Sequence, residues 1–441
     1  MTNESAHELN GYLEKGLGRA HVVLEQGADT SQREALVAAC LRDDALPLEG
    51  SRAAYLLELV RLVGVTHDLA AALADPLADC PGDDDIEQRY ELVGRLARSG
   101  VPGMSEVLYR GQEQLIDRWL ADPVEWGPST VPARHLIAID GVRGGVFAFS
   151  QLGRATLAGA SFSDDQELID AAYDGLDGEQ ADAMLAQARA TDPRLDAFLR
   201  AAENTVVPVP DPLLPAGWSE RPWIEAQATI ERRVRATDSL GAFASHWGDK
   251  ASEGDLAIAA QALVDLPKDD LKLLRAYLWV FRKRPFPLDP APLISLIDDT
   301  RPHLATFAIA ALELVSHPAV RAVALRMADK GPHRRFALGL LARNWDPGDE
   351  LIAEGLLRAA AGRREAVHTL GYGLRAVIEA HPSAPELVPA VRLAYELEPC
   401  SSCRTDFVTA LLRLSALPDG IRAECRWDAN EETRRLVSAE A

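Results

Sequence analysis

The stretch LISLIDDTRPHLATFAIAALELVSHPAVRAVALRMADKGPHRRFALGLLARNW, from Leu293 to Trp345, decides the fold of this chain. Its apolar residues recur at intervals of three and four, which places them on one face of an α-helix. Three such runs follow one another, and a proline or glycine stands near the start of each, at Pro302, Pro318 and Gly331-Pro332. Proline is tolerated in the first turn of a helix because the N–H that it lacks has no partner there. The stretch therefore predicts three short, consecutive helices.

The same pattern recurs from Arg301 to the end of the chain. Five segments share a frame in which a polar or basic residue precedes an apolar pair by three positions, and they begin at Arg301, His333, Arg363, Arg404 and Thr433. Successive segments are offset by 32, 30, 41 and 29 residues. Stacked helix pairs produce such a drifting period, because each pair buries its apolar face against the next. We therefore expect an all-α protein, a superhelical solenoid of stacked antiparallel helix pairs with room for two lobes.

A second pattern points to a family. An Asp is followed six residues later by an Arg that opens an apolar helix, at Asp329 to Arg335 and again at Asp428 to Arg434. This spacing resembles the HEAT-type helical repeat, and the resemblance is strongest over residues 271–441. It implies an α-solenoid that binds partners, with Asp329, Arg335, Asp428 and Arg434 as a structural ladder between repeats. Such a fold carries no chemistry of its own.

A proline-rich stretch suggests the domain boundary. TVVPVPDPLLPAGWSERPW, from Thr205 to Trp223, contains five prolines and favours extended backbone over helix. We expect an acidic helical lobe at 1–205, a linker or strap at 206–222, and a HEAT-like lobe at 223–441. A strap would press Trp218 and Trp223 onto the helices, whereas a linker would leave both tryptophans exposed.

Composition and charge narrow the class of protein. The chain has 441 residues, 47% of them hydrophobic and 26% charged, which is typical of a folded chain. The net charge of −21 is uneven, since residues 1–270 carry 23 Lys+Arg against 46 Asp+Glu, whereas residues 271–441 carry 23 against 21. The first part therefore repels polyanions and the second does not.

Membrane insertion and secretion are both disfavoured. No apolar run reaches the ~20 residues that a bilayer-spanning helix needs, and the first residues are polar, without the basic and then apolar pattern of a signal peptide. The five cysteines are an odd number and widely spaced, unlike a secreted disulfide framework. We expect a cytoplasmic protein with reduced cysteines and no membrane partner.

Cys400-Ser-Ser-Cys403 is the one motif whose spacing carries chemistry. A CxxC at the head of a helix favours a thiolate, and it also supplies half of a zinc site. No βαβ context supports redox work, Cys425 stands alone, and no histidine follows His381. The sequence therefore favours a structural role for Cys400 and Cys403, with a metal site and a reactive pair as the alternatives.

Arginines at the heads of the repeat helices form a candidate binding surface. Stacking would bring them to one edge of the solenoid, and the partner-binding candidates are Arg334, Arg363, Arg364, Arg404 and Arg435. Helix N-termini and guanidinium groups both attract phosphates and carboxylates. The alternative is that Arg335 and Arg434 belong to the ladder and the other arginines are simply solvated.

The function that follows is binding rather than catalysis. The sequence has no GxSxG elbow, no HExxH motif and no phosphate-binding loop. We expect a scaffold that binds another protein, has no catalytic site and needs no cofactor. One alternative is an enzyme acting on nucleic acid, like the DNA glycosylases built of HEAT-like repeats, although the net charge of −21 opposes a nucleic-acid partner. A CxxC metal or redox protein is the other alternative.

Overall fold

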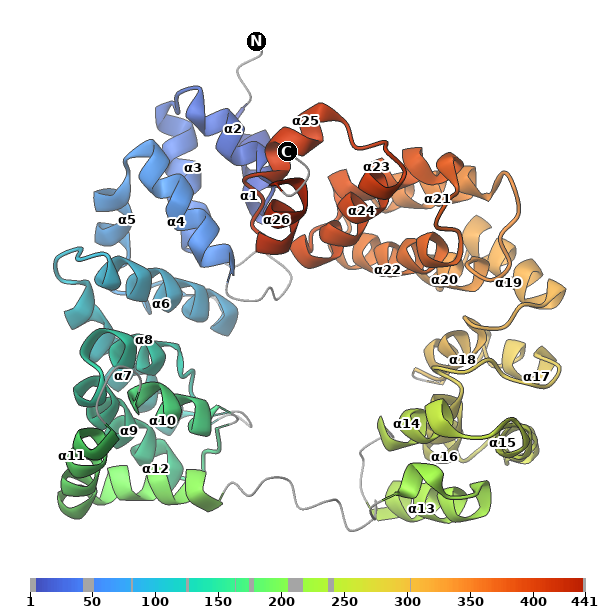
Figure 1. Ribbon diagram of the computed structural model, residues 1–441, viewed down its shortest axis with the longest axis horizontal. Coiled ribbons are helices and arrows are strands. Elements are labelled where there is room, and N and C mark those ends of the chain that lie inside the picture. The colour runs from blue at the N-terminus through green and yellow to red at the C-terminus, as the bar shows by residue number, and fades with distance from the viewer. Residues whose placement is uncertain are drawn as a thin grey trace. The chain divides into compact units, whose positions relative to one another are not determined.

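The computed structural model describes residues 5–42, 51–80, 82–123, 127–162, 164–173, 178–204, 217–236, 242–301 and 303–438. Within these ranges the chain forms 26 α-helices and three short 3-10 turns and contains no strand (Figure 1). The all-α expectation is therefore confirmed. None of the described helices combines the length and the apolar character that a bilayer crossing requires.

The helices form two compact units. Unit 1 comprises Met1–Val207 and Asp419–Ala441, and unit 2 comprises Pro208–Pro418. This division differs from the expected lobes at the C-terminus, because the last segment packs with the first unit although its sequence continues the repeat pattern. Of the proline-rich stretch, residues 205–216 lie outside the described residues.

Unit 1 begins with twelve helices in chain order. They are α1 (Ala6–Lys15), α2 (Arg19–Glu25), α3 (Thr30–Cys40), α4 (Ser51–Val63), α5 (Thr66–Ala72), α6 (Asp83–Arg98), α7 (Met104–Ala121), α8 (Val131–Asp140), α9 (Val142–Leu157), α10 (Asp165–Tyr173), α11 (Gly178–Thr191) and α12 (Pro193–Asn204). Capping boxes at Ser5 and Asp29 start α1 and α3, because each side chain accepts from the third backbone N–H of its helix. Two apolar clusters lie between these helices, and Ala429 from the end of the chain joins the first cluster.

The C-terminal helices α25 (Asp419–Cys425) and α26 (Glu431–Ser438) complete unit 1. Figure 1 shows α25 beside α2, more than 390 residues earlier in the chain. The guanidinium of Arg19 donates to both oxygens of Glu424, at 2.6 and 2.9 Å. A Cβ on Gly18 would lie 1.8 Å from the Glu424 carbonyl oxygen, so this approach requires glycine. The two ends of the chain therefore pack together within unit 1.

Unit 2 contains the turn η1 (Trp218–Glu220) and twelve further helices. They are α13 (Trp223–Ala236), α14 (Ala242–Lys250), α15 (Glu253–Asp265), α16 (Leu271–Val280), α17 (Ala291–Ile294), α18 (Leu304–Leu312), α19 (Pro318–Asp329), α20 (Ala337–Leu341), α21 (Asp349–Ala360), α22 (Arg364–Ala380), α23 (Val388–Leu397) and α24 (Ser401–Arg413), with turns η2 (Arg334–Phe336) and η3 (Pro385–Leu387). Helices repeatedly pack against the helix two places further on, as in α16 with α18, α20 with α22, α21 with α23 and α22 with α24.

Both tryptophans near the proline-rich stretch pack within unit 2. Trp223 opens α13, is 1% exposed, and lies 4.9 Å from the Trp247 ring and 5.2 Å from the Tyr277 ring. Trp218 in η1 lies 5.9 Å from the ring of Phe243. Residues 217–223 are therefore anchored on α14 and α16 by aromatic contacts.

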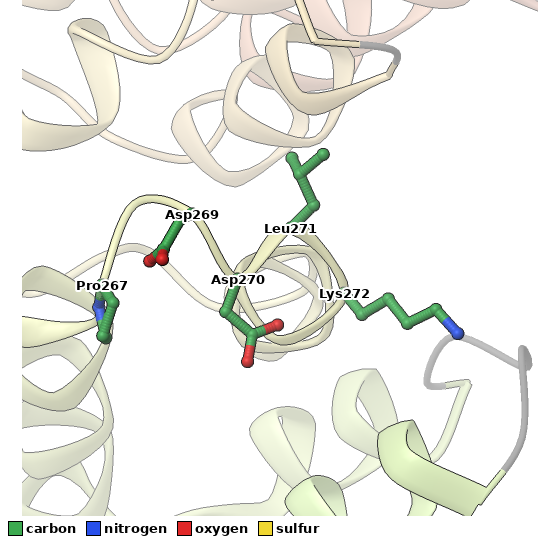
Figure 2. A pocket seen from close by; sticks show the side chains of 5 residues that line it. All are labelled: Pro267, Asp269, Asp270, Leu271 and Lys272. Carbon is green, nitrogen blue, oxygen red and sulfur yellow. The ribbon is translucent and has the colours of Figure 1, made fainter.

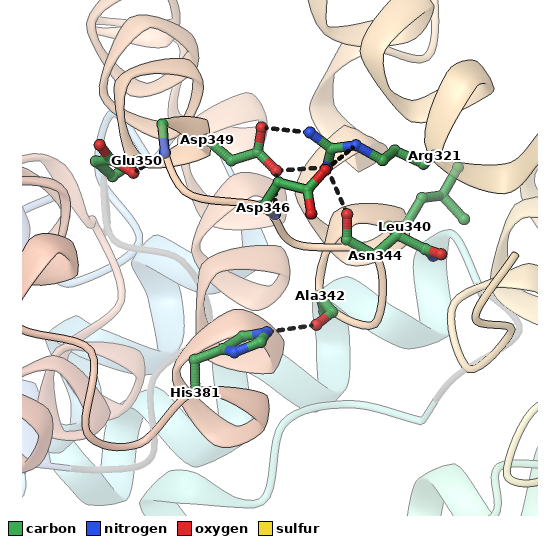
Figure 3. A network of polar contacts seen from close by, with 9 residues as sticks. Arg321, Leu340, Ala342, Asn344, Asp346, Asp349, Glu350 and His381 are labelled. Atoms are coloured by element: carbon green, nitrogen blue, oxygen red, sulfur yellow. Dashed lines mark hydrogen bonds and ion pairs between the residues drawn. The ribbon is translucent and has the colours of Figure 1, made fainter. Parts of the chain in front are cut away.

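A polar network ties α19 to the loop before α21 (Figure 3). The Arg321 guanidinium donates to the two carboxylate oxygens of Asp349, at 2.6 and 3.0 Å, and to the backbone carbonyl of Asn344 at 2.5 Å. The Asn344 amide donates to the carbonyls of Val315 and Leu340, both at 2.9 Å. Planar, bidentate pairing of this kind fixes both partners, so the network sets how one helix pair meets the next.

Candidate functional site

Unit 2 places two of the predicted partner-binding arginines around one cavity. The cavity has a volume of about 420 Å³ and lies between the α19–η2 loop, α21 and α22. Its charged lining residues are Asp329, Lys330, Arg334, Arg335 and Arg363. Four cationic groups and one carboxylate therefore converge on the same cavity.

The floor of this cavity is apolar. Leu356 and Ala360 come from α21, Leu370 comes from α22, and each of the three is 2% exposed. The hydrocarbon parts of arginine side chains can cover such a floor while their charged heads remain in water. The cavity, which we call the basic pocket, thus combines an apolar base with a cationic rim.

Helix geometry adds to the positive potential at the basic pocket. Arg363 is the N-cap residue of α22, a helix of 17 residues, and Arg364 is its first residue. The N-terminus of a helix carries a partial positive charge, so cations there oppose the helix dipole. This placement costs α22 a few tenths of a kcal/mol of helix stability and strengthens the local attraction for anions.

The other predicted arginines do not join this pocket. Arg404 is 0% exposed within α24 and donates to the Glu398 carbonyl at 3.2 Å, so its burial excludes it from an exposed stripe. Arg364 is half-buried and does not line the cavity. Arg435 lies on α26 in unit 1 and pairs with Glu432. The sequence frame aligned these residues, but the direction of each side chain depends on its own helix and neighbours.

The ladder residues make contacts other than the expected Asp–Arg pairs. Arg335 donates to Glu365 at 2.8 Å, which lies 30 residues further along, while Asp329 is paired with Lys330 at 3.7 Å. Arg335 and Asp329 are both lining residues of the basic pocket, but the ion pairs that they form are with Glu365 and Lys330.

In unit 1, Arg434 likewise pairs with a carboxylate other than that of its predicted partner Asp428. Its guanidinium donates to the backbone carbonyl of Asp428 at 2.6 Å and to the Glu58 carboxylate at 3.2 Å. The Asp428 side chain accepts from the backbone N–H of Asn430 at 2.9 Å. Arg434 therefore bridges α26 to α4, with Asp428 contributing its backbone rather than its carboxylate.

A second candidate site lies at the start of α24. Cys400 is the N-cap residue and is 8% exposed, and Cys403 follows one turn later at intermediate exposure. A ring nitrogen of His368, on α22, and the two Sγ atoms all lie within 4.8 Å of one another. We call His368, Cys400 and Cys403 the Cys–His cluster.

The Glu398 carboxylate contacts both His368 and the backbone of Cys400. Its carboxylate is 0% exposed, and Oε1 lies 2.7 Å from Nδ1 of His368 and accepts from the Cys400 backbone N–H at 3.1 Å. Oε2 is buried without a hydrogen-bond partner. A Cβ on Gly371 would lie 2.4 Å from Oε2, so a glycine on α22 makes room for the carboxylate. Glu398 therefore orients the imidazole and the N-terminus of α24 together.

Ionisation within the cluster follows from these contacts. The hydrogen bond between the thiols lowers the pKa of Cys400 to about 6, with further help from the Cys403 backbone N–H. The same thiol–thiol bond, together with burial, raises the pKa of Cys403. The bond to Glu398 raises the pKa of His368. One thiolate therefore forms readily, and it forms at the buried position.

The sequence alone did not connect His368 and Glu398 with the cysteines. The zinc alternative considered only Cys425 and the segment after His381, whereas His368 precedes Cys400 by a whole helix pair. The repeat period was the usable signal, because His368 and Glu398 are 30 residues apart, close to the offsets of the repeat frame. In stacked helix pairs, a residue that precedes a motif by one repeat length lies on the neighbouring pair and can contact the motif.

Another cavity of unit 2 has no converging groups. It has a volume of about 610 Å³ and is lined by Pro267, Asp269 and Asp270 from the turn before α16 and by Leu271 and Lys272, the first residues of α16. Their side chains point in different directions (Figure 2). The Asp270 carboxylate caps α16 by accepting from the Leu273 N–H at 3.0 Å. We therefore assign this turn a structural role.

Comparison with protein-family models, with curated proteins and with solved structures finds no match for this chain.

Proposed function

We propose that this chain is a HEAT-like α-solenoid that acts in the cytoplasm as a scaffold and binds an acidic segment of another protein in the basic pocket. The observation that carries the proposal is the convergence of Lys330, Arg334, Arg335 and Arg363 above an apolar floor. A segment with acidic and apolar side chains on one face complements both features. The free thiols of all five cysteines agree with a reducing compartment.

Recurring contacts support the solenoid part of the proposal. Several polar side-chain pairs in unit 2 link successive helices at sequence separations of 28 to 31 residues, and these pairs are Glu253–Arg284, Asp298–Arg326, Arg321–Asp349, Arg335–Glu365, His368–Glu398 and Arg375–Asp406. The separations agree with the period expected from the sequence. A solenoid makes nearest-neighbour contacts at its repeat length, whereas an irregular bundle has no such period.

The partner is better described as a protein than as a nucleic acid. Nucleic-acid grooves track a long phosphate backbone with many cations, and their affinity falls steeply with salt. The basic pocket is one compact cavity, and residues 1–270 carry a net charge of −23. A short acidic segment needs only the local potential, which acts over a Debye length of ~8 Å at physiological salt.

Binding to a labelled helical peptide of glutamate and leucine tests the proposal by fluorescence anisotropy. Arg334→Glu with Arg363→Glu should weaken binding by about 5–100-fold, since each exposed ion pair contributes about 0.2–1 kcal/mol and reversal turns attraction into repulsion. Arg392→Glu is the matched control, because Arg392 is an exposed arginine on α23 outside the pocket.

The same variants distinguish the competing functions. A native partner recovered by affinity capture should be lost from the double variant and retained by Arg392→Glu. Tight binding to single-stranded or double-stranded DNA that depends on Arg334 and Arg363 would contradict the scaffold and favour an enzyme acting on nucleic acid. Equal peptide binding by the wild type and the double variant would also refute the proposal.

A further inference from the structure

We propose that the Cys–His cluster of unit 2 is a binding site for a zinc-like divalent metal ion, with His368, Cys400 and Cys403 as ligands and Glu398 as the residue that positions His368. This site is independent of the basic pocket. It also departs from the structural role that the sequence favours for the two cysteines.

The donor set suits zinc. Two thiolates and one imidazole are soft or borderline ligands, which favour zinc over magnesium or calcium. Zinc bond lengths of about 2.3 Å to sulfur and about 2.0 Å to nitrogen place tetrahedral ligand atoms about 3.5–3.8 Å apart. The three donor atoms already lie within 4.8 Å of one another, so side-chain movements of about 1 Å close the site.

The surroundings of His368 match those of a metal-ligating histidine. Such a histidine usually donates its second ring N–H to a carboxylate, which fixes the tautomer and the ring orientation. Nδ1 of His368 lies 2.7 Å from the fully buried Glu398 carboxylate, which leaves the lone pair on Nε2 for a metal. The rings of Tyr372 and His368 pack edge to face with their centroids 4.7 Å apart, which further restrains the imidazole. The imidazole is thus held in place before any metal arrives.

The buried charge around the cluster is a second, independent argument. Glu398 is 0% exposed and one of its oxygens has no hydrogen-bond partner, an arrangement that is costly in a protein interior. A dication held by two thiolates adds no net charge, but its position beside the carboxylate offsets part of that cost. The Arg404 guanidinium, which is also fully buried, donates to the Glu398 backbone carbonyl. The charges of the dication, the two thiolates, the Glu398 carboxylate and the Arg404 guanidinium then sum to about zero.

Accessibility favours a metal site over a dithiol oxidoreductase. The helix N-terminus stabilises a thiolate at Cys400, so Cys400 would be the attacking thiol of a CxxC enzyme. Cys400 as a residue is only 8% exposed, whereas Cys403 is the more accessible of the two. A metal site, unlike the attacking thiol of an oxidoreductase, does not have to be reached by a second protein. Three protein ligands leave one coordination position for water, at a cluster whose neighbour Tyr372 is 48% exposed.

Cobalt(II) titration of the reduced, metal-depleted, full-length protein tests the site. We expect one ion per chain, a thiolate-to-cobalt charge-transfer band, the ligand-field bands of tetrahedral cobalt, and displacement by zinc. Cys403→Ser should weaken the charge-transfer band, and His368→Gln should lower the affinity while retaining sulfur coordination. Glu398→Gln should lower the affinity by about 10–100-fold, as loss of a positioning carboxylate does.

Cys80→Ser is the matched control, since Cys80 is a partly exposed cysteine of unit 1 and should leave the titration unchanged. Circular dichroism checks that each variant is folded, and His368→Gln decides the question if Cys403→Ser unfolds. Absence of saturable cobalt or zinc binding by the wild type overturns the proposal. So does a reversible Cys400–Cys403 disulfide in a protein that binds no metal, which would make the cluster a redox pair.

Discussion

Replacement of Arg321 by alanine should be among the most destabilising changes on the polar surface of unit 2. Arg321 holds both oxygens of Asp349 and the Asn344 carbonyl, and it also lies 2.9 Å from Asp346. The Asp349 side chain is 5% exposed, so removal of the arginine strands a buried carboxylate. The remaining partner is the Asp346 backbone N–H, at 2.9 Å.

The size of the effect follows from burial. Breaking a fully buried ion pair costs about 3–5 kcal/mol, because the remaining charge stays desolvated. The Arg321 side chain is 24% exposed, so water can reach part of the vacated space. Asp349 also opens α21, where the helix dipole stabilises a negative charge by about 0.3–1 kcal/mol. We therefore expect Arg321→Ala to cost about 2–3 kcal/mol.

The assay is urea denaturation followed by circular dichroism, combined with hydrogen exchange of the α19 and α21 amides, because the two units can unfold separately. Arg321→Lys should cost less than alanine, since an ammonium keeps the charge but loses the bidentate geometry. Combining Arg321→Ala with Asp349→Asn should recover part of the loss. Unchanged exchange in both helices of Arg321→Ala would refute the reasoning.

Three further outcomes are expected. Arg335→Ala should cost no more than about 1 kcal/mol in the same urea assay, because the Arg335 and Glu365 side chains are 40% and 78% exposed. Burial raises the pKa of Glu313 above 4.5, so its contribution to stability is present below pH 4.5 and is lost as pH rises through the folded pKa. Glu313→Gln should therefore be more stable than the wild type at about pH 8 and similar to it at about pH 4, and equal stability at both would contradict this. Gly18→Ala should cost about 1–3 kcal/mol and release α25, whereas Gly11→Ala, with open space around it, should be neutral or stabilising.

Helix content and helix placement were readable from the sequence because both depend on local chemistry. The apolar spacing around Leu304 and Val320 corresponds to α18 and α19, and Pro318 stands in the first turn of α19. The run after Gly331-Pro332 is less regular, since η2 precedes the five-residue α20. The recurring sequence frame also pointed to arginines at the heads of helices, and these included Arg334 and Arg363 of the basic pocket.

Side-chain direction and long-range pairing were decided by the tertiary structure. The frame treated Arg404 like Arg363, yet Arg404 is fully buried beside Glu398 while Arg363 is exposed at the basic pocket. The last segment continues the repeat pattern but packs on α2, because Gly18 allows a backbone approach that no local pattern encodes. His368 meets Cys400 and Cys403 only when α22 and α24 stack. Periodicity therefore determined which residues form helices, whereas packing between helices determined which of their side chains meet.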